Sequence, residues 1–170
     1  DEEWNNMQND INKPMYNRYL SAYVPGSSLK PIIGAIGLKG NYFSKDDDFG
    51  ESGTKWQNDS SWGNLYVTTL TTYQGPANLR NALIYSDNIY FAKAALKIGK
   101  NNLQNDLDGF GFNDKIDFVQ DISISTYGEM DSDSAIANSG YGQDKLLVNP
   151  IHMGMMYSCF ANGGNMVMPC

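Results

Sequence analysis

The chain has 170 residues, 41% of them hydrophobic and 18% charged, which is the composition of an ordinary globular domain with one core. Its formal net charge of -7 argues against a nucleic-acid partner, because phosphate binding requires clustered Lys and Arg. No apolar run reaches the length of about 18 residues that crosses a membrane, and no signal peptide is visible at the start.

The first part of the chain predicts a polar arm followed by a helix. Residues 1–22 are polar and Asn-rich, which indicates irregular chain or a short helix. Helical signals follow over 27–38, with Ser27 at the start and Lys30 on the next turn. Positions i and i+3 share one face of a helix, so the hydroxyl and the amine can lie side by side. Because a desolvated lysine can take the proton of a serine hydroxyl, this pair suggests acyl transfer.

The pattern Ser-x-x-Lys is short, and a second copy runs from Ser52 to Lys55. Polar residues follow this copy, so no apolar helix would bury its lysine. The surrounding segment, 39–75, is rich in Gly, Asp, Ser and Thr and predicts loop with small strands, for example over 65–68. The first copy therefore needs support from motifs elsewhere in the chain.

The middle of the chain predicts two helices, over 78–85 and 88–98, joined by a tight connection. Ser86, Asp87 and Asn88 lie at this connection. A Ser-x-Asn there can direct a hydroxyl and an amide into a shared cleft, where the hydroxyl relays a proton and the amide holds a peptide group. The alternative is that Ser86 or Asp87 simply caps the second helix.

The remaining residues predict a short helix, a long loop and a last helix. The short helix stops at Gly111, and residues 112–138, which are acidic and Ser-rich, predict mostly loop. Asn138 to Gln143 forms a glycine turn in this interpretation. The last helix begins at Asn149-Pro150, a cap followed by proline at the first helical position, and ends at Gly163-Gly164.

Cysteine and histidine give no sign of a metal site or of another cofactor. Cys159 lies on a predicted buried helix face and Cys170 is the last residue, and a disulfide between them is open because pairing cannot be deduced from sequence. A single histidine without a Cys-x-x-Cys pattern argues against zinc. That histidine, His152, is expected at the surface or in a groove rather than as a base.

Three of these segments together resemble the transpeptidase domain of the penicillin-binding proteins. The matching segments, in the family's order, are Pro25-Gly26-Ser27-Ser28-Leu29-Lys30-Pro31, Ser86-Asp87-Asn88, and Ser139-Gly140-Tyr141-Gly142-Gln143 running into Leu147-Val148-Asn149-Pro150. Residues 56–63 and 87–92 look most like the class B, low-affinity, methicillin-resistance type. The resemblance covers the chain from about residue 13. It implies an α+β fold of the penicillin-recognising, β-lactamase-like kind, of which this chain holds mainly the α-helical lobe and few short strands.

The resemblance also implies roles for individual residues. Ser27 would be the nucleophile, acylated by the penultimate D-Ala carbonyl of a peptidoglycan stem peptide or by a β-lactam antibiotic, and Lys30 would be its neutral general base. Ser86 would pass the proton to the departing D-alanine, while Asn88 would hold the substrate amide. The backbone N–H of Ser27 would supply half of the oxyanion hole. Further substrate contacts would come from Asp87, Tyr141 and Gln143.

The family's third motif, Lys-Thr/Ser-Gly, is absent from this sequence. In the family it lies on an edge strand of the central antiparallel sheet, binds the substrate carboxylate and supplies the second oxyanion N–H. We therefore expect residues 1–170 to be a partial transpeptidase domain that lacks the C-terminal part of this sheet, and to be inactive alone or nearly so. Both ends look cut from a longer parent.

For that parent, the resemblance implies a place on the extracytoplasmic face of the bacterial cell membrane, with an N-terminal helix absent from this chain as the anchor. Division or elongation proteins are possible partners, and nucleic acid is not.

Three alternatives stay open. A serine β-lactamase shares the first two motifs, but Glu129-Met130-Asp131 lacks the asparagine that accompanies the deacylating glutamate of class A enzymes. A β-lactam sensor or non-catalytic relative would bind without turnover, and its flanking segments would distinguish it. The third alternative is a soluble helical domain with chance motifs.

Overall fold

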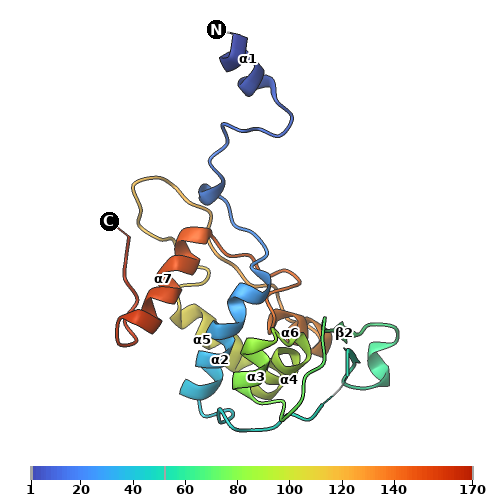
Figure 1. The fold of residues 1–170 in the computed structure, drawn as a ribbon. Helices are drawn as coiled ribbons and strands as arrows, with labels where there is room; N and C mark the ends of the chain where they lie inside the picture. Colours follow the sequence, from blue (N-terminus) through green and yellow to red (C-terminus); the bar gives the residue numbers. More distant parts are fainter. Residues whose placement is uncertain (1, 52, 170) are drawn as a thin grey trace.

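The computed structural model describes residues 2–51 and 53–169 and shows a helical body from which an N-terminal arm extends (Figure 1). Helix α1, Glu2–Asn9, lies at the far end of this arm and buries none of its residues. A 3-10 turn, Arg18–Leu20, lies where the arm reaches the body. The prediction of irregular chain with a short helix is confirmed for the described part of the arm.

The helix predicted after the arm is present. It begins as a 3-10 turn, Gly26–Leu29, and continues as α2, Lys30–Lys39. Pro31 lies in the first turn of α2, where its missing N–H leaves no helical hydrogen bond unmade. A Cβ atom at Gly37 would lie only 1.9 Å from the ring of Phe43, so this side of α2 requires a glycine for its close packing.

A small hairpin lies between α2 and the next helix. Strands β1, Lys55–Trp56, and β2, Val67–Thr68, pair antiparallel, with Lys55 opposite Thr68. The intervening loop contains the 3-10 turn Ser60–Trp62, and Trp62 is buried beside Val67. This confirms the prediction of loop with small strands, while Ser52 of the second Ser-x-x-Lys lies outside the described residues.

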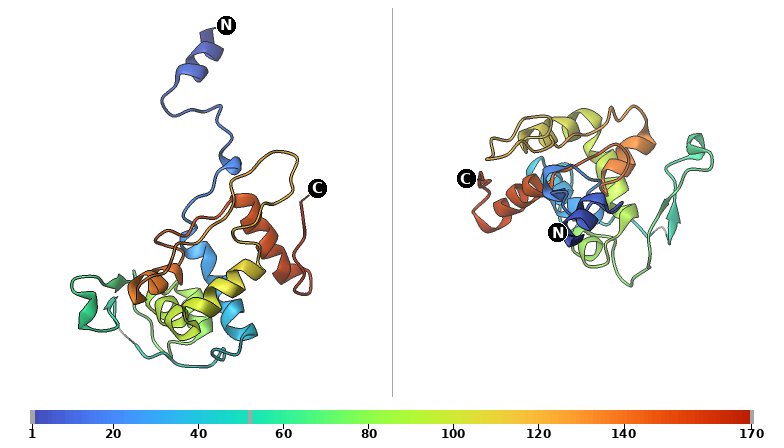
Figure 2. Two further views of the ribbon diagram at one scale, coloured as in Figure 1. Left: turned by 180° about the vertical axis from the view of Figure 1, so that it is seen from behind. Right: turned by 90° about the horizontal axis from the view of Figure 1, so that it is seen from above.

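Three helices follow in the predicted order: α3, Leu79–Ile84; α4, Asn88–Ile98; and α5, Lys100–Gly109. Helix α4 is central and packs against α2, α3, α5 and the later helix α6 (Figure 1, Figure 2). It buries Tyr90 and Phe91 together with several alanines, and these small side chains allow its neighbours to approach closely. The centre of the body is therefore the helix that begins at the predicted Ser-x-Asn.

Residues 112–138 are mostly loop, as predicted, except at their end, where Asp133–Ser139 form helix α6. The hydroxyl of Ser132 accepts a hydrogen bond from Ala135 N and caps this helix. Ile136 and Ala137 are buried, and α6 packs along α4. The Ser and Asp residues that indicated loop are the cap and first turn of a helix too short to show a clear apolar period.

Helix α7, Pro150–Ala161, is the last helix and begins at the predicted cap, Asn149, whose Oδ1 accepts from Ile151 N at 2.9 Å. The residue before this cap, Val148, forms an antiparallel bridge with Tyr23 and so joins α7 to the chain entering α2.

No helix among the described residues is both long and apolar enough to cross a bilayer. Cys159 is partly buried, and its possible partner, Cys170, lies outside the described residues.

The prediction that His152 lies at the surface or in a groove is wrong. Its side chain is fully buried, with Nδ1 at 2.7 Å from Ser125 Oγ and Nε2 at 2.8 Å from Phe110 O. A carbonyl oxygen only accepts, so Nε2 carries the proton of the neutral ring and Nδ1 accepts from the serine. The segments around Phe110 and Ser125 therefore cover this part of α7. No pattern in the sequence predicted that they pack there.

This buried histidine predicts a loss of stability in acid. Burial lowers the pKa of His152 in the folded chain, and the hydrogen bond to Phe110 opposes this. The unfolded chain, with a histidine pKa of about 6.5, therefore binds more protons, and the free energy of unfolding falls as the pH drops below that value. We expect His152→Phe to be less stable by about 1–3 kcal/mol at neutral pH, with a smaller difference near pH 5. Urea unfolding at the two pH values measures this, and a constant difference would contradict it.

Candidate active site

The structure brings together the four residues predicted to be catalytic. Lys30 Nζ lies 3.1 Å from Ser27 Oγ, 2.9 Å from Ser86 Oγ and 2.6 Å from Asn88 Oδ1. The two hydroxyl oxygens, Ser27 Oγ and Ser86 Oγ, are 3.0 Å apart. The start of α2 and the α3–α4 connection thus place one amine and two hydroxyls in mutual hydrogen-bond contact.

Lys30 is buried at the bottom of this cluster, with 2% of the residue exposed, and its amine lies 5.8 Å from the centre of the Phe91 ring. Burial lowers the pKa of Lys30 to about 8, and the charge of Asp87 partly opposes this. A lysine with this pKa is neutral in an appreciable fraction of molecules near neutral pH. It can therefore accept a proton, which an ordinary surface lysine cannot do at that pH.

The partners of Lys30 also direct its lone pair. Its amine donates to Ser86 O at 2.6 Å and to Asn88 Oδ1 at 2.6 Å, and both of these carbonyl oxygens can only accept. In a neutral amine these two contacts use both N–H groups. The lone pair then remains for the hydroxyl of Ser27, which itself accepts a hydrogen bond from Ser86 Oγ, and this is the arrangement that a general base requires.

Ser86 adopts an unusual backbone conformation in order to make these contacts. Its φ is +53°, in the left-handed region, which costs a non-glycine residue about 1–3 kcal/mol. This conformation presents both its carbonyl oxygen and its hydroxyl to Lys30. Strain of this kind persists only where the surroundings hold it, and such residues cluster at active sites.

The turn before Ser27 is held by the loop after α6. Gly26 N donates to Gly142 O at 2.9 Å, and Gly26 has a φ of +55°. A Cβ atom on Gly142 would lie 2.2 Å from Gly26 O, so only glycine allows this contact. The Ser27 hydroxyl is exposed above this turn, and its N–H makes no hydrogen bond to any described residue. That N–H is therefore available to a ligand.

The three residues predicted to bind substrate, Asp87, Tyr141 and Gln143, differ from one another in burial and in their hydrogen-bond partners. The carboxylate of Asp87 is buried and caps α4, accepting from Ile89 N at 2.9 Å and Tyr90 N at 3.2 Å, which confirms the capping interpretation for this residue. Tyr141 is half-buried and donates to Asn138 Oδ1 at 2.6 Å. Gln143 is exposed beside Gly26. Substrate contact by these three side chains stays a prediction, and Gln143 is the only one of the three that is exposed.

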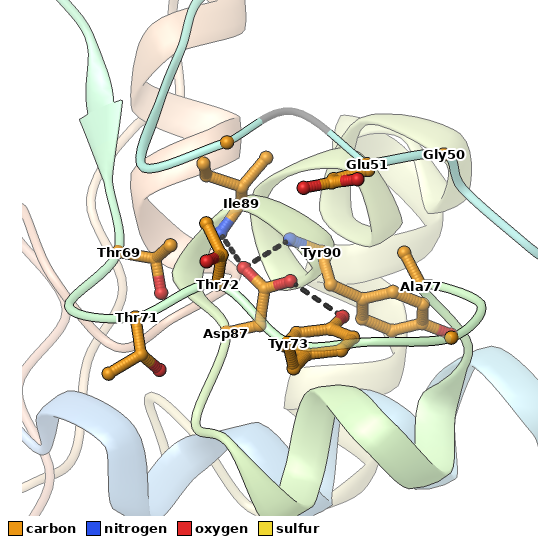
Figure 3. A pocket seen from close by; sticks show the side chains of 12 residues that line it. Gly50, Glu51, Thr69, Thr71, Thr72, Tyr73, Ala77, Asp87, Ile89 and Tyr90 are labelled. Atoms are coloured by element: carbon orange, nitrogen blue, oxygen red, sulfur yellow. Dashed lines mark hydrogen bonds between the residues drawn. The ribbon is translucent and has the colours of Figure 1, made fainter.

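Sequence reasoning missed two parts of the site that come from the segment before α3. Asn88 Nδ2 donates to Thr68 O at 2.8 Å, and the hydroxyl of Tyr73 donates to Asp87 Oδ2 at 2.9 Å (Figure 3). Figure 3 shows Tyr73 and Asp87 side by side in a small pocket that Thr69 and Tyr90 also line. No motif marks Tyr73, because the segment around it has no regular spacing of apolar residues.

Comparison with known proteins relates the whole chain to one family. The family described as penicillin binding protein transpeptidase domain matches residues 2–170. Penicillin-binding protein 3 of Bacillus subtilis (strain 168) is 38% identical over an alignment that covers 99% of this chain and 26% of that protein. A Mesostigma viride protein named peptidoglycan D,D-transpeptidase FtsI homolog is 23% identical, over 88% of this chain and 27% of its own length. The chain spans about a quarter of the length of these curated relatives.

Solved structures show the same fold. The ceftriaxone acyl-enzyme complex of penicillin-binding protein A from M. tuberculosis matches with a TM-score of 0.86 at 21% identity, over 99% of this chain and 38% of that chain. A complex between penicillin-binding protein PBP2 and MreC from Helicobacter pylori matches with a TM-score of 0.81 at 21% identity, over 99% of this chain and 33% of that chain. The described helices therefore have the arrangement found in these proteins.

Proposed function

This chain belongs to the family of penicillin-binding protein transpeptidase domains, and on that basis we propose that it carries the acylating half of a serine-type peptidoglycan D,D-transpeptidase. The observation that supports this most directly is the contact of one buried amine, Lys30 Nζ, with the hydroxyls of both Ser27 and Ser86. The substrate would be a peptidoglycan stem peptide, and β-lactam antibiotics would acylate the same serine. The reaction requires no metal or other cofactor.

In the acylation step, the Ser27 hydroxyl attacks the penultimate D-Ala carbonyl while neutral Lys30 takes its proton. An ester bond forms at Ser27 Oγ as the peptide C–N bond breaks. Lys30 then returns the proton through Ser86 to the amine of the departing D-alanine, a path that the 2.9 Å and 3.0 Å contacts of Ser86 Oγ allow. An amine of a second stem peptide then attacks the ester: a new C–N bond forms, the ester C–O bond breaks, and the proton of the amine returns to Ser27 Oγ through the same hydroxyl and amine groups.

Negative charge on the carbonyl oxygen develops near the start of α2. The N–H of Ser27, which has no hydrogen-bond partner among the described residues, would donate to this oxygen from the 3-10 turn Gly26–Leu29, where the partial positive charge of the helix start favours an anion. Asn88 keeps its Oδ1 on Lys30 and one Nδ2 hydrogen on Thr68 O, which leaves the second Nδ2 hydrogen for a substrate carbonyl. Tyr141 and Gln143 would line the same opening from the loop after α6.

The parent of this chain would be a class B protein of the low-affinity type, anchored at the extracytoplasmic face of the cell membrane. Residues 1–170 would be part of its transpeptidase domain, with the C-terminal part of the central sheet supplied by the rest of the parent. Proteins of cell division or elongation would be its partners, which the similarity to a PBP2 bound to MreC supports.

Peptide mapping of the longer parent after reaction with penicillin tests this proposal. We expect one covalent adduct, on the peptide that contains Ser27, and fragmentation should place it on Ser27 rather than on the adjacent Ser28. An adduct on Ser28 or Ser86, or none, would contradict the proposed nucleophile. An adduct on Ser27 without turnover of stem peptides would instead favour the β-lactam-sensing alternative.

A further inference from the structure

We propose that Tyr73 is a positioning residue for the acylation described above, because it contacts both chain neighbours of Ser86, Tyr85 and Asp87. Its ring stacks on that of Tyr85, with the ring centres 4.7 Å apart and the planes at 7°. Its hydroxyl donates to Asp87 Oδ2 at 2.9 Å. The inference deepens the proposed function and rests on it, since it assigns Tyr73 to the same site.

Ser86 needs such support because its backbone is strained. Its φ of +53° is the feature that turns both its carbonyl and its hydroxyl toward Lys30. Relaxation of this residue to an ordinary conformation would withdraw at least one of the two oxygens. A side chain that holds the residues on either side of Ser86 opposes that relaxation.

The second contact of Tyr73 acts on the charge beside Lys30. Asp87 uses Oδ1 to cap α4 and Oδ2 to accept from Tyr73, so both oxygens have partners. Asp87 is also the charged group that raises the pKa of Lys30 against the effect of burial. The hydrogen bond from Tyr73 stabilises the carboxylate in place and offsets part of its field at the amine.

Other titratable groups near this pair are Lys93 and Tyr90 on α4, and Asp48 and Glu51 on the segment before β1, of which Glu51 and Tyr90 line the same pocket as Tyr73 and Asp87. The charges of Asp87 and Asp48 raise the pKa of Lys93 against the larger effect of burial, which lowers it. Asp48 and Tyr90 make smaller contributions to the raised pKa of Tyr73. Burial, followed by its hydrogen bond to Asp87, raises the pKa of the Tyr73 hydroxyl, so this group stays protonated and keeps its role as a donor throughout the pH range of the reaction.

Packing alone does not explain Tyr73. It belongs to none of the hydrophobic clusters found among the described residues, and it comes from a segment, 69–78, that forms no helix or strand. Its ring lies on Tyr85, which is itself 46% exposed, rather than on a core side chain. Its specific contacts are those that bracket Ser86.

The experiment compares Tyr73→Phe with the unchanged parent protein, using the second-order rate of acylation by a fluorescent penicillin between pH 6 and 10. The variant keeps the ring stack and loses the hydroxyl. We expect the rate at neutral pH to fall about tenfold, as loss of a hydrogen bond to a charged group predicts. We also expect the rising limb of the pH–rate profile to move to higher pH, because the field of Asp87 on Lys30 is no longer offset. Tyr66→Phe, which removes an exposed hydroxyl beside β2, is the matched control and should leave both quantities unchanged.

The outcomes separate this inference from the proposed function. If the unchanged parent is not acylated at Ser27, the proposed function fails. If it is acylated and Tyr73→Phe has the same rate and profile, the assignment of Tyr73 is wrong. A lower rate with an unmoved profile would also contradict it, since general destabilisation would lower the amount of reactive protein without shifting the titration of Lys30. Far-ultraviolet circular dichroism of each variant checks that the fold is intact.

Discussion

Lys30→Met in the longer parent protein is expected to reduce the rate of acylation of Ser27 by penicillin about 10²–10⁴-fold, which is the usual contribution of a positioned general base. Methionine has an apolar stem of similar length and fits the buried site beside Phe91, but it can neither accept the serine proton nor return one through Ser86. The measurement is the rate of appearance of the fluorescent acyl-enzyme under conditions in which the antibiotic is in excess.

The matched control for this substitution is Lys39→Met. Lys39 is the last residue of the same helix and is exposed, so its loss removes one positive charge from α2 without touching the site. We expect this variant to react at the normal rate. A Lys30→Met protein that is folded by circular dichroism and acylates within about threefold of normal would show that another group takes the serine proton.

The rate of acylation of the unchanged protein is expected to depend on pH through the protonation of Lys30. With a pKa of about 8 for Lys30, the neutral fraction increases as the pH rises toward that value. The two carbonyl acceptors, Ser86 O and Asn88 Oδ1, hold the amine in either charge state. Protonation therefore removes the lone pair of the amine without moving its nitrogen. We therefore expect the rate of acylation to rise with pH up to about the pKa of Lys30, as the neutral fraction of this lysine increases.

Short-range patterns in the sequence predicted much of this arrangement. The i, i+3 spacing of Ser27 and Lys30 depends only on helix geometry, and the cap at Asn149 and the glycine end of α4 depend only on local backbone chemistry. That the two helices bring Ser86 against Lys30 depends instead on tertiary packing. In the sequence, only the resemblance to a known family indicated it.

The features that the sequence did not predict all arise from contacts between distant segments. His152 is buried because the segments around Phe110 and Ser125 fold over α7, and no local pattern reports that. The left-handed backbone of Ser86 is not encoded by a glycine, so no turn signal marked it. In the sequence, Gly142 resembles an ordinary turn residue. The structure shows that a Cβ atom at this position would lie 2.2 Å from Gly26 O, so the glycine allows this loop to pack against the turn that carries the nucleophile.

The chain of residues 1–170 by itself is expected to react with penicillin at least about 10²–10³-fold more slowly than its longer parent. We propose this because the chain has no Lys-Thr/Ser-Gly tripeptide, which in this family supplies the second oxyanion N–H and binds the antibiotic carboxylate. Loss of one oxyanion donor alone costs about 2.7–4 kcal/mol of transition-state stabilisation. Ser27, Lys30 and Ser86 can still exchange protons in this chain, but one side of the reacting carbonyl would be unsupported.

Labelling with a fluorescent penicillin measures this difference, with the parent and the shorter chain at equal concentration and with Ser27→Ala in each as the blank. Helical content is compared by circular dichroism, because the cluster around Lys30 depends on α2 and α4 being packed together. Stoichiometric labelling of Ser27 in the shorter chain at the parent's rate would contradict the proposal. It would mean that the Ser27 N–H and the Lys30 cluster are sufficient for acylation, and that the strand with Lys-Thr/Ser-Gly serves binding rather than the chemical step in this family.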